Sequence, residues 1–182
     1  MIEDKYLILV NKTNICPKDL NFNIVDVNSK YAPNRYAEEK TFKAFLKLKD
    51  YALKHGYDIE IESGYRSTEH QQKVFNNCIN QKGLDYAKKY VAIPGYSEHH
   101  TGLALDICLK KDDKFIIEHN LPEDFKTFLQ NNAHLFEFII RYPKNKELIT
   151  GYNYEPWHLR YVGNTSKEIY QNNLTLEEYL NK

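Results

Sequence analysis

Hydrophobic and polar positions recur with two different periods along the chain, and these periods predict where helices and strands lie. Residues 36–55 place Phe42, Phe45, Leu46 and Leu53 at helical spacing, with lysines on the opposite face. This pattern predicts an amphipathic helix whose apolar face packs against a core.

Capping patterns locate the starts of two more helices. Thr68 with Gln71, and Thr175 with Glu178, each have the three-residue spacing of a capping box. The first predicts a helix that runs to about residue 77, and the second predicts a short helix near the C-terminus. Spacing alone predicts further helices at residues 83–90 and 122–131.

Strands are predicted where side chains alternate or where β-branched and aromatic residues gather. Ile59–Glu60–Ile61–Glu62 alternates with period two. Residues 12–35 contain two prolines and many asparagines and are expected to be irregular. The other predicted strands lie at residues 5–11, 103–109, 136–142 and 154–162. Helices and strands mix without a regular βαβ alternation, which predicts an α+β fold: a single domain with a central antiparallel sheet flanked by helices.

The predicted strand at residues 103–109 has two unlike faces, because successive side chains of a strand point to opposite sides. One face is apolar, and the other holds a carboxylate beside a small residue. The apolar face is Leu103, Leu105 and Ile107, and the other is Ala104, Asp106 and Cys108. Asp106 therefore has room around it for a ligand.

Length and composition restrict the class of protein. The chain has 182 residues, so one domain over residues 1–182 is expected. Lys plus Arg and Asp plus Glu each number 25, and this zero net charge argues against a nucleic-acid partner or a polybasic membrane anchor. Hydrophobic residues make up 42%, which is too many for an intrinsically disordered chain.

Cysteines and the N-terminal residues bear on location. Cys16, Cys78 and Cys108 are an odd number without a Cys-x-x-Cys pair, which favours free thiols in a reducing compartment and disfavours a cysteine-based zinc site. The first apolar run is short, follows two acids and lacks a small-residue cleavage site, so no signal peptide or membrane segment is expected. These features predict a cytoplasmic protein.

Three polar segments carry the candidate chemistry: residues 63–71, 94–106 and 155–161. His99 lies in a glycine-flanked turn seven residues before Asp106, and imidazole nitrogen and carboxylate oxygen are both good zinc ligands. His158 in the last segment offers a third ligand. A catalytic zinc site keeps a fourth position for water, so this set is a candidate catalytic centre.

Two further residues would complete a hydrolase. Glu155 precedes His158 by three positions, and Pro156 makes a regular ladder unfavourable there, so the Glu155 side chain can turn back toward the metal and act as a general base. Arg66 is one of only four arginines, and its planar charge suits a carboxylate or a developing oxyanion.

Taken in order, these segments resemble the zinc D-alanyl-D-alanine carboxypeptidases and dipeptidases of the VanY, VanX and VanXY type. That family's pattern is Ser-Gly-Tyr-Arg-Ser with a following Gln, then Ser-x-His-x-x-Gly-x-Ala-x-Asp, then Glu-Pro-Trp-His-x-Arg-Tyr. Every element is present here, and the match extends over residues 59–163. The resemblance implies the fold shared by D-Ala-D-Ala peptidases and hedgehog-type domains.

The resemblance also implies residue roles. It makes His99, Asp106 and His158 the Zn²⁺ ligands, Glu155 the catalytic base, and Arg66 the residue that binds the substrate anion or oxyanion. Substrate contacts are expected from Ser97 and Gln71, with Tyr154 as a further candidate beside the third segment, and Trp157 packing beside the site.

The implied reaction is hydrolysis of the D-Ala-D-Ala dipeptide or removal of the terminal D-Ala from peptidoglycan precursor pentapeptides, as in glycopeptide-resistance systems. The chain most resembles the cytoplasmic VanXY-type enzymes. Two alternatives of the same fold remain: an L,D-carboxypeptidase or endolysin-type peptidoglycan peptidase, and a zinc-containing binding module without turnover. Substrate length depends on the loops at residues 78–94 and 110–124.

Several residues also have structural interpretations. Arg160 is expected to pin a carboxylate within the sheet, and Arg141 is ambiguous. Ser97 could only cap the turn before His99, and Glu155 could orient a ligand. The remaining expectations are a buried Cys108, a surface or supporting role for His100, and surface positions for His55, His70, His119 and His134.

Overall fold

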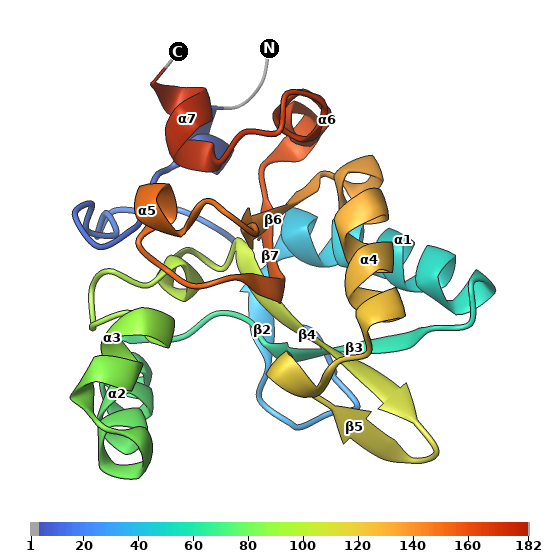
Figure 1. Ribbon diagram of the computed structural model, residues 1–182, viewed down its shortest axis with the longest axis horizontal. Coiled ribbons are helices and arrows are strands. Elements are labelled where there is room, and N and C mark those ends of the chain that lie inside the picture. The colour runs from blue at the N-terminus through green and yellow to red at the C-terminus, as the bar shows by residue number, and fades with distance from the viewer. Residues whose placement is uncertain (1–3, 182) are drawn as a thin grey trace.

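Five antiparallel strands form the central sheet of the computed structural model, which describes residues 4–181 (Figure 1). The order is β3–β4–β7–β6, with β5 paired to β4. Strands β1 and β2 pair with each other in a separate two-stranded sheet. The bounds are β1 (Ile24–Asp26), β2 (Tyr36–Glu38), β3 (Asp58–Ser63), β4 (Ala104–Lys111), β5 (Lys114–Ile116), β6 (Phe138–Tyr142) and β7 (Glu155–Tyr161).

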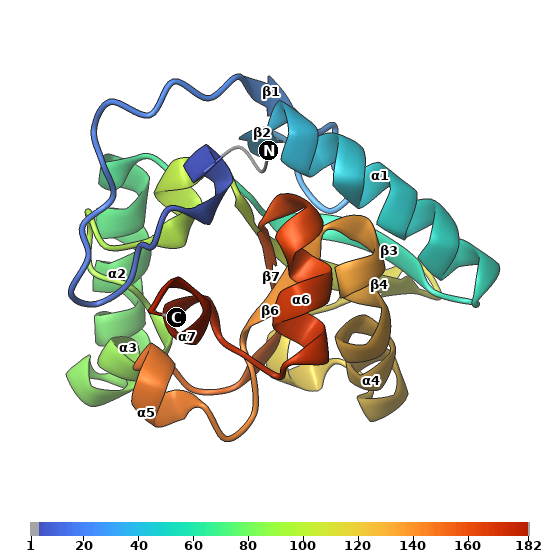
Figure 2. The same ribbon diagram turned by 90° about the horizontal axis from the view of Figure 1, so that it is seen from above.

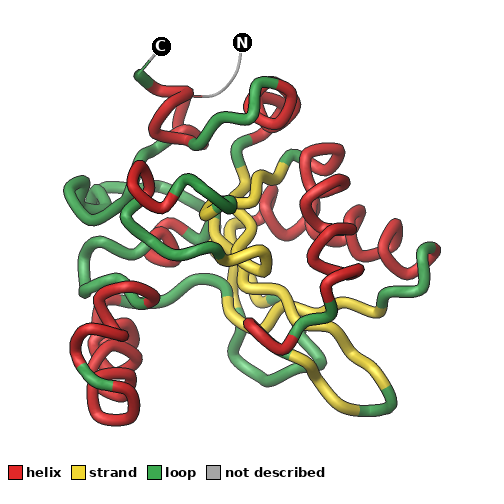
Figure 3. The backbone as a smooth tube through the Cα atoms, in the orientation of Figure 1, coloured by secondary structure: helices red, strands yellow, loops and turns green. Residues whose placement is uncertain are grey.

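The longer helices lie on both sides of this sheet. Figures 1 and 2 both place α1 and α4 on one side and α2 and α3 on the other, and Figure 3 shows the strands between them. The bounds are α1 (Glu39–Lys54), α2 (Thr68–Lys82), α3 (Leu84–Tyr90), α4 (Glu123–Asn132), α5 (Glu147–Thr150), α6 (Ser166–Gln171) and α7 (Leu176–Leu180). The predicted α+β fold with a central antiparallel sheet is confirmed.

The main hydrophobic core fills the space between the sheet and the helices α1 and α4. As the period-two pattern predicts, Leu105 and Ile107 of β4, together with Leu103 just before it, point into this core. Phe45 of α1 and Phe125 of α4 meet them there and are almost fully buried. Asp106 points to the opposite face of the sheet, so the core side of β4 stabilises the fold while its other side is available for chemistry.

The buried face of α1 differs in part from the predicted one. Phe45 is buried and Phe42 packs against the core, but Leu46 and Leu53 are 44% and 59% exposed. The face that packs on the sheet is instead Thr41, Ala44, Phe45, Leu48 and Ala52. This face combines two large apolar side chains with three small ones.

The predicted strand at residues 5–11 is wrong. This segment begins with a 3-10 helix, Asp4–Leu7, and then runs without strand pairing. Two of its carbonyl groups are satisfied by a side chain: the Arg160 guanidinium donates to the backbone oxygens of Tyr6 and Ile8 at 3.0 and 2.7 Å. An arginine therefore replaces the neighbouring strand that the apolar run would need.

Capping confirms one predicted helix start and corrects the other. Thr175 and Glu178 form a capping box at α7, as predicted. At α2 the cap is Ser67, whose hydroxyl accepts from the His70 amide, and Gln71 turns into the protein. The pattern did not predict β1, β2, β5, α5 or α6, which are all short; β2 takes the first three residues of the helix predicted for residues 36–55. No described helix has the length and apolar character needed to cross a membrane; the cytoplasmic location stays a prediction.

Candidate metal centre and active site

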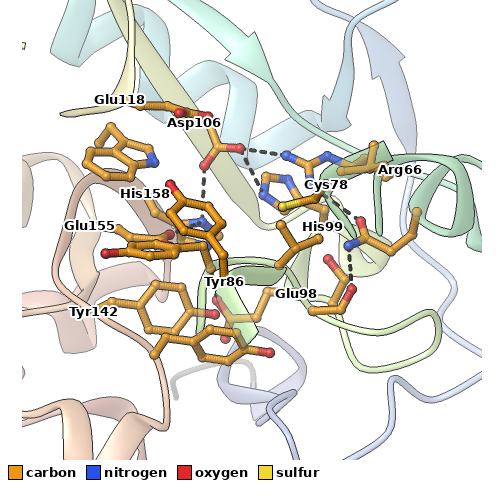
Figure 4. Close-up of a pocket in the computed structure, with 18 of the residues that line it drawn as sticks. Arg66, Cys78, Tyr86, Glu98, His99, Asp106, Glu118, Tyr142, Glu155 and His158 are labelled. Atoms are coloured by element: carbon orange, nitrogen blue, oxygen red, sulfur yellow. Dashed lines mark hydrogen bonds and ion pairs between the residues drawn. The ribbon is translucent and has the colours of Figure 1, made fainter. Parts of the chain in front are cut away.

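Three side chains from separate segments meet on the sheet face that lies opposite the core (Figure 4). His99 lies on a 3-10 helix (Glu98–Thr101), Asp106 on β4 and His158 on β7. Asp106 and His158 are cross-strand partners, so their side chains point to the same side. The ligand atoms of all three residues lie within 4.8 Å of one another. The structure thus brings the predicted ligand set together.

Asp106 is the centre of this cluster. Its Oδ2 lies 3.1 Å from His99 Nε2, and its Oδ1 lies 3.1 Å from His158 Nδ1. Arg66 donates to Oδ2 at 2.7 Å. Two imidazoles and a carboxylate that are almost fully buried form a donor set that suits zinc, with space left for water.

Each histidine presents a different nitrogen to this centre. His99 Nδ1 lies 2.7 Å from the Gly64 carbonyl oxygen and must donate to it, which leaves the Nε2 lone pair facing Asp106. His158 has the reverse orientation, with Nδ1 toward Asp106. Gly64 can pack closely against the backbone of Tyr36 because it has no side chain: an added Cβ would lie 2.1 Å from the Tyr36 oxygen. Sequence reasoning did not single out Gly64 by itself.

The two imidazoles also differ in protonation. Burial and the nearby Arg66 charge lower the pKa of His99 to about 4, so its ring is neutral and able to bind a metal. Burial would also lower the pKa of His158, but the neighbouring carboxylates of Asp106 and Glu98 outweigh it and raise the value to about 9. Without a metal, His158 therefore holds a proton at neutral pH.

Glu155 lies beside the cluster, as predicted. It is 5% exposed, and its Oε2 is 3.8 Å from His158 Nδ1. Burial raises the pKa of its carboxyl, the charge on His158 lowers it, and the nearby Asp106 carboxylate raises it further. The net effect is a pKa of about 8. A carboxyl with a pKa near neutrality can both accept and return a proton.

Arg66 is held from three directions. It donates to Ser63 Oγ at 2.8 Å, to Gln71 Oε1 at 3.3 Å and to Asp106 Oδ2 at 2.7 Å. Gln71 is itself fixed by donating to the Ala92 carbonyl at 2.7 Å. The guanidinium therefore has one orientation in the pocket, and Gln71 supports Arg66 as well as lining the pocket.

The cluster opens into a pocket of about 330 Å³ (Figure 4). Ser97 and Trp157 line it, as expected, and Ser97 makes no side-chain capping bond. The wall away from the cluster comes from α2 and α3: Val74, Asn77, Cys78, Gln81, Lys82, Tyr86 and Tyr90.

The pocket lining differs from the predicted one at Tyr154, and it includes one residue that was not proposed for it. Tyr154 is not among the lining residues: its hydroxyl accepts from Gln130 of α4 at 2.8 Å. Neighbours in an extended chain point to opposite sides, so with Glu155 facing the cluster Tyr154 faces away. His119 is exposed, as expected, and it also lines the pocket and packs edge-on against Trp157 at 4.8 Å between ring centroids.

A buried charge network lies behind the cluster. Arg160 donates to Glu98 Oε1 at 2.6 Å, which confirms its expected structural role, and Arg141 donates to the same oxygen at 2.7 Å. Arg141 also bonds Glu177. Sequence reasoning missed Glu98; its position next to His99 and the scarcity of arginines were the available signals. Cys108 is buried and free, as are Cys16 and, less deeply, Cys78.

The α+β fold places two histidines and an aspartate on one face of its antiparallel sheet, beside a buried glutamate and a fixed arginine. This arrangement is the framework of a zinc metallopeptidase. Comparison with known proteins identifies the family. The family model for VanY, D-alanyl-D-alanine carboxypeptidase, matches residues 34–164, and the chain belongs to this family.

Individual relatives agree with this assignment. The putative carboxypeptidase YodJ of Bacillus subtilis (strain 168) is 42% identical over 186 residues, which cover 98% of this chain and 68% of YodJ. A mutant of the vancomycin-resistance D,D-pentapeptidase VanY in complex with Zn(II) has a TM-score of 0.85 at 33% identity, covering 97% of this chain and 99% of that one. The LdcB LD-carboxypeptidase has a TM-score of 0.83 at 41% identity, covering 97% and 86%.

Proposed function

We propose that this chain hydrolyses D-Ala-D-Ala or the terminal D-Ala of peptidoglycan precursor pentapeptides, with zinc bound by His99, Asp106 and His158. The observation that supports this most directly is the buried cluster of these three side chains with Glu155 beside it, inside a pocket that contains Arg66. When bound, zinc supplies a Lewis acid that activates water and polarises a carbonyl.

Glu155 handles the proton in this mechanism. Its carboxylate accepts a proton from the attacking water, and the resulting acid donates that proton to the leaving amine as the peptide bond breaks. Burial raises the pKa of this carboxyl in the absence of a metal, and a divalent cation bound beside it would favour the charged form that accepts the proton. Burial excludes competing water from around the carboxyl.

Arg66 supplies the permanent positive charge. Ser63, Gln71 and Asp106 fix its guanidinium, so it can meet the substrate's C-terminal carboxylate or the developing oxyanion without reorganising. Lys82 also lines the pocket. A pocket with a fixed arginine beside a divalent metal suits an anionic peptide end.

The shape of the pocket supports substrates longer than a dipeptide. It extends from the cluster to α2 and α3, where Asn77, Gln81 and Lys82 offer hydrogen-bonding groups and Tyr86 and Tyr90 offer rings. Residues on the amino side of the scissile bond would lie along this wall. The likeness to LdcB favours a second candidate, an L,D-carboxypeptidase that trims tetrapeptides.

Kinetics on three substrates test these functions. We expect the zinc-loaded chain to release D-Ala from D-Ala-D-Ala or a pentapeptide, chelator to abolish release, and added zinc to restore it, with products read by mass spectrometry. Release from the tetrapeptide alone would replace the first candidate by the second. Tight peptide binding without product over hours would contradict both and favour the binding module.

Zinc affinity is expected to rise about tenfold per pH unit between about pH 7 and pH 9. The pKa of His158 is raised to about 9, above its ordinary value of 6.5, so its proton is present at neutral pH and is lost as the pH rises through 9. Zinc must displace that one proton, whereas the lowered pKa of His99 leaves none to displace there. Competition with a chelator of known protonation measures the effect, and a flat profile would contradict it.

A further inference from the structure

The carboxylate of Glu98 faces a metal-ligand candidate that is not its neighbour in sequence. Glu98 precedes His99, but its Oε2 lies 3.6 Å from Nε2 of His158. Both atoms are buried, and neither has a hydrogen-bond partner. The His158 ring is thus placed between two carboxylates, with Nδ1 toward Asp106 and Nε2 toward Glu98.

Two arginines fix the position of this carboxylate. Arg141 and Arg160 donate to the other oxygen of Glu98, Oε1, at 2.7 and 2.6 Å. Glu177 of α7 holds Arg141 from the far side through two bonds of 2.9 and 2.7 Å. Both arginines are fully buried, so the carboxylate has no freedom to rotate and Oε2 is left for His158.

We infer that Glu98 is a positioning residue, which holds the His158 ring with its proton on Nε2 and its Nδ1 lone pair directed at the zinc. The inference rests on the proposed role of His158 as a ligand. A carboxylate opposite a ligating histidine fixes the ring and strengthens its basicity. His99 has a weaker partner for the same task, the neutral carbonyl of Gly64.

Two matched variants separate positioning from structural support. Glu98→Gln removes the charge that faces His158, and Glu177→Gln removes a charge from the same buried network without touching the ligand. We expect Glu98→Gln to raise the zinc Kd about 10- to 100-fold and to change the visible spectrum of the Co²⁺-loaded chain. Glu177→Gln should lower the unfolding temperature but leave the zinc Kd within about twofold. Equal changes in zinc Kd for the two variants would overturn the inference.

A second variant and a measurement on the unchanged chain decide the matter if Glu98→Gln does not fold. Glu98→Asp keeps the charge for the arginines but shortens the reach toward His158, so its zinc Kd should also rise about tenfold. In the zinc-loaded chain, ¹⁵N NMR should show the His158 proton on Nε2. A proton on Nδ1, or a folded Glu98→Asp with unchanged zinc Kd, would overturn the inference.

These readouts do not depend on turnover. A chain whose zinc affinity depends on Glu98 but which cleaves none of the three peptides would contradict the proposed function and leave the positioning role intact. A chain that cleaves these peptides but whose zinc affinity does not depend on Glu98 would support the proposed function and contradict the positioning role.

Discussion

Replacing Glu155 by Gln is expected to lower kcat for release of the C-terminal D-residue by about 10²- to 10⁴-fold while zinc binding is retained. The amide has nearly the same shape as the carboxylate, so the packing of this buried position is preserved, but it cannot accept a proton from water or return one to the leaving amine. Glu155 faces His158 at 3.8 Å rather than bonding it closely, so losing its charge removes proton transfer more than metal binding.

Steady-state kinetics and a metal assay on the same preparation measure both parts of this expectation. Glu123→Gln is a matched control, since Glu123 is an exposed glutamate on α4 that pairs with Lys126. It should leave kcat unchanged. Full activity in Glu155→Gln would contradict the role of general base. Loss of zinc together with activity would instead make Glu155 a residue that supports the metal site.

Two of the three metal-ligand candidates could be predicted from sequence because local patterns place their side chains. Period-two alternation in β4 places Asp106 opposite the apolar row, and a glycine-flanked turn presents His99 beside it. His158 follows from the register of β7 against β4, which the sequence does not specify but which the family pattern implies. The residue types themselves limit the metal to one that prefers nitrogen and oxygen ligands.

What sequence could not predict depends on contacts between distant segments. The run at residues 5–11 has the composition of a strand, yet no strand pairs with it and Arg160 bonds two of its carbonyl groups. Glu98 gains its role only because β6, β7 and α7 bring Arg141, Arg160 and Glu177 around it. The bonds from Arg160 to Tyr6 and Ile8 join residues 154 and 152 positions apart, and no local pattern records them.

The direction of some side chains was also predicted wrongly. Tyr154 lies beside a catalytic candidate in sequence but on the opposite side of the chain, where it meets Gln130. On α1, Leu46 and Leu53 follow helical spacing yet remain exposed, because the contact with the sheet selects Ala44 and Leu48 instead. A helical period gives the existence of a face but does not say which of two neighbouring stripes is buried.

Replacing Gly64 by Ala is expected to damage the metal centre without changing any ligand. The added Cβ would lie 2.1 Å from the backbone oxygen of Tyr36, an oxygen that also accepts the Tyr65 amide at 2.6 Å. Neither backbone segment can yield as a flexible side chain would, so the chain between β3 and α2 must shift. The Gly64 carbonyl then moves from His99 Nδ1, which it now meets at 2.7 Å, and the ring loses its orientation.

A displacement of about 1 Å at a catalytic centre can cost about 10²-fold in rate, and overpacking of this kind costs about 1–3 kcal/mol in stability. We therefore expect Gly64→Ala to lower kcat/KM at least about 100-fold, to raise the zinc Kd, and to lower the urea midpoint. Gly56→Ala is the control: it introduces backbone strain at φ +88° but its Cβ meets no atom within 4 Å. It should lose stability of about 1–2 kcal/mol and keep its zinc affinity. An unchanged zinc Kd in folded Gly64→Ala would show that His99 is oriented by its other contacts, because the carbonyl of Gly64 could then move without consequence for the metal.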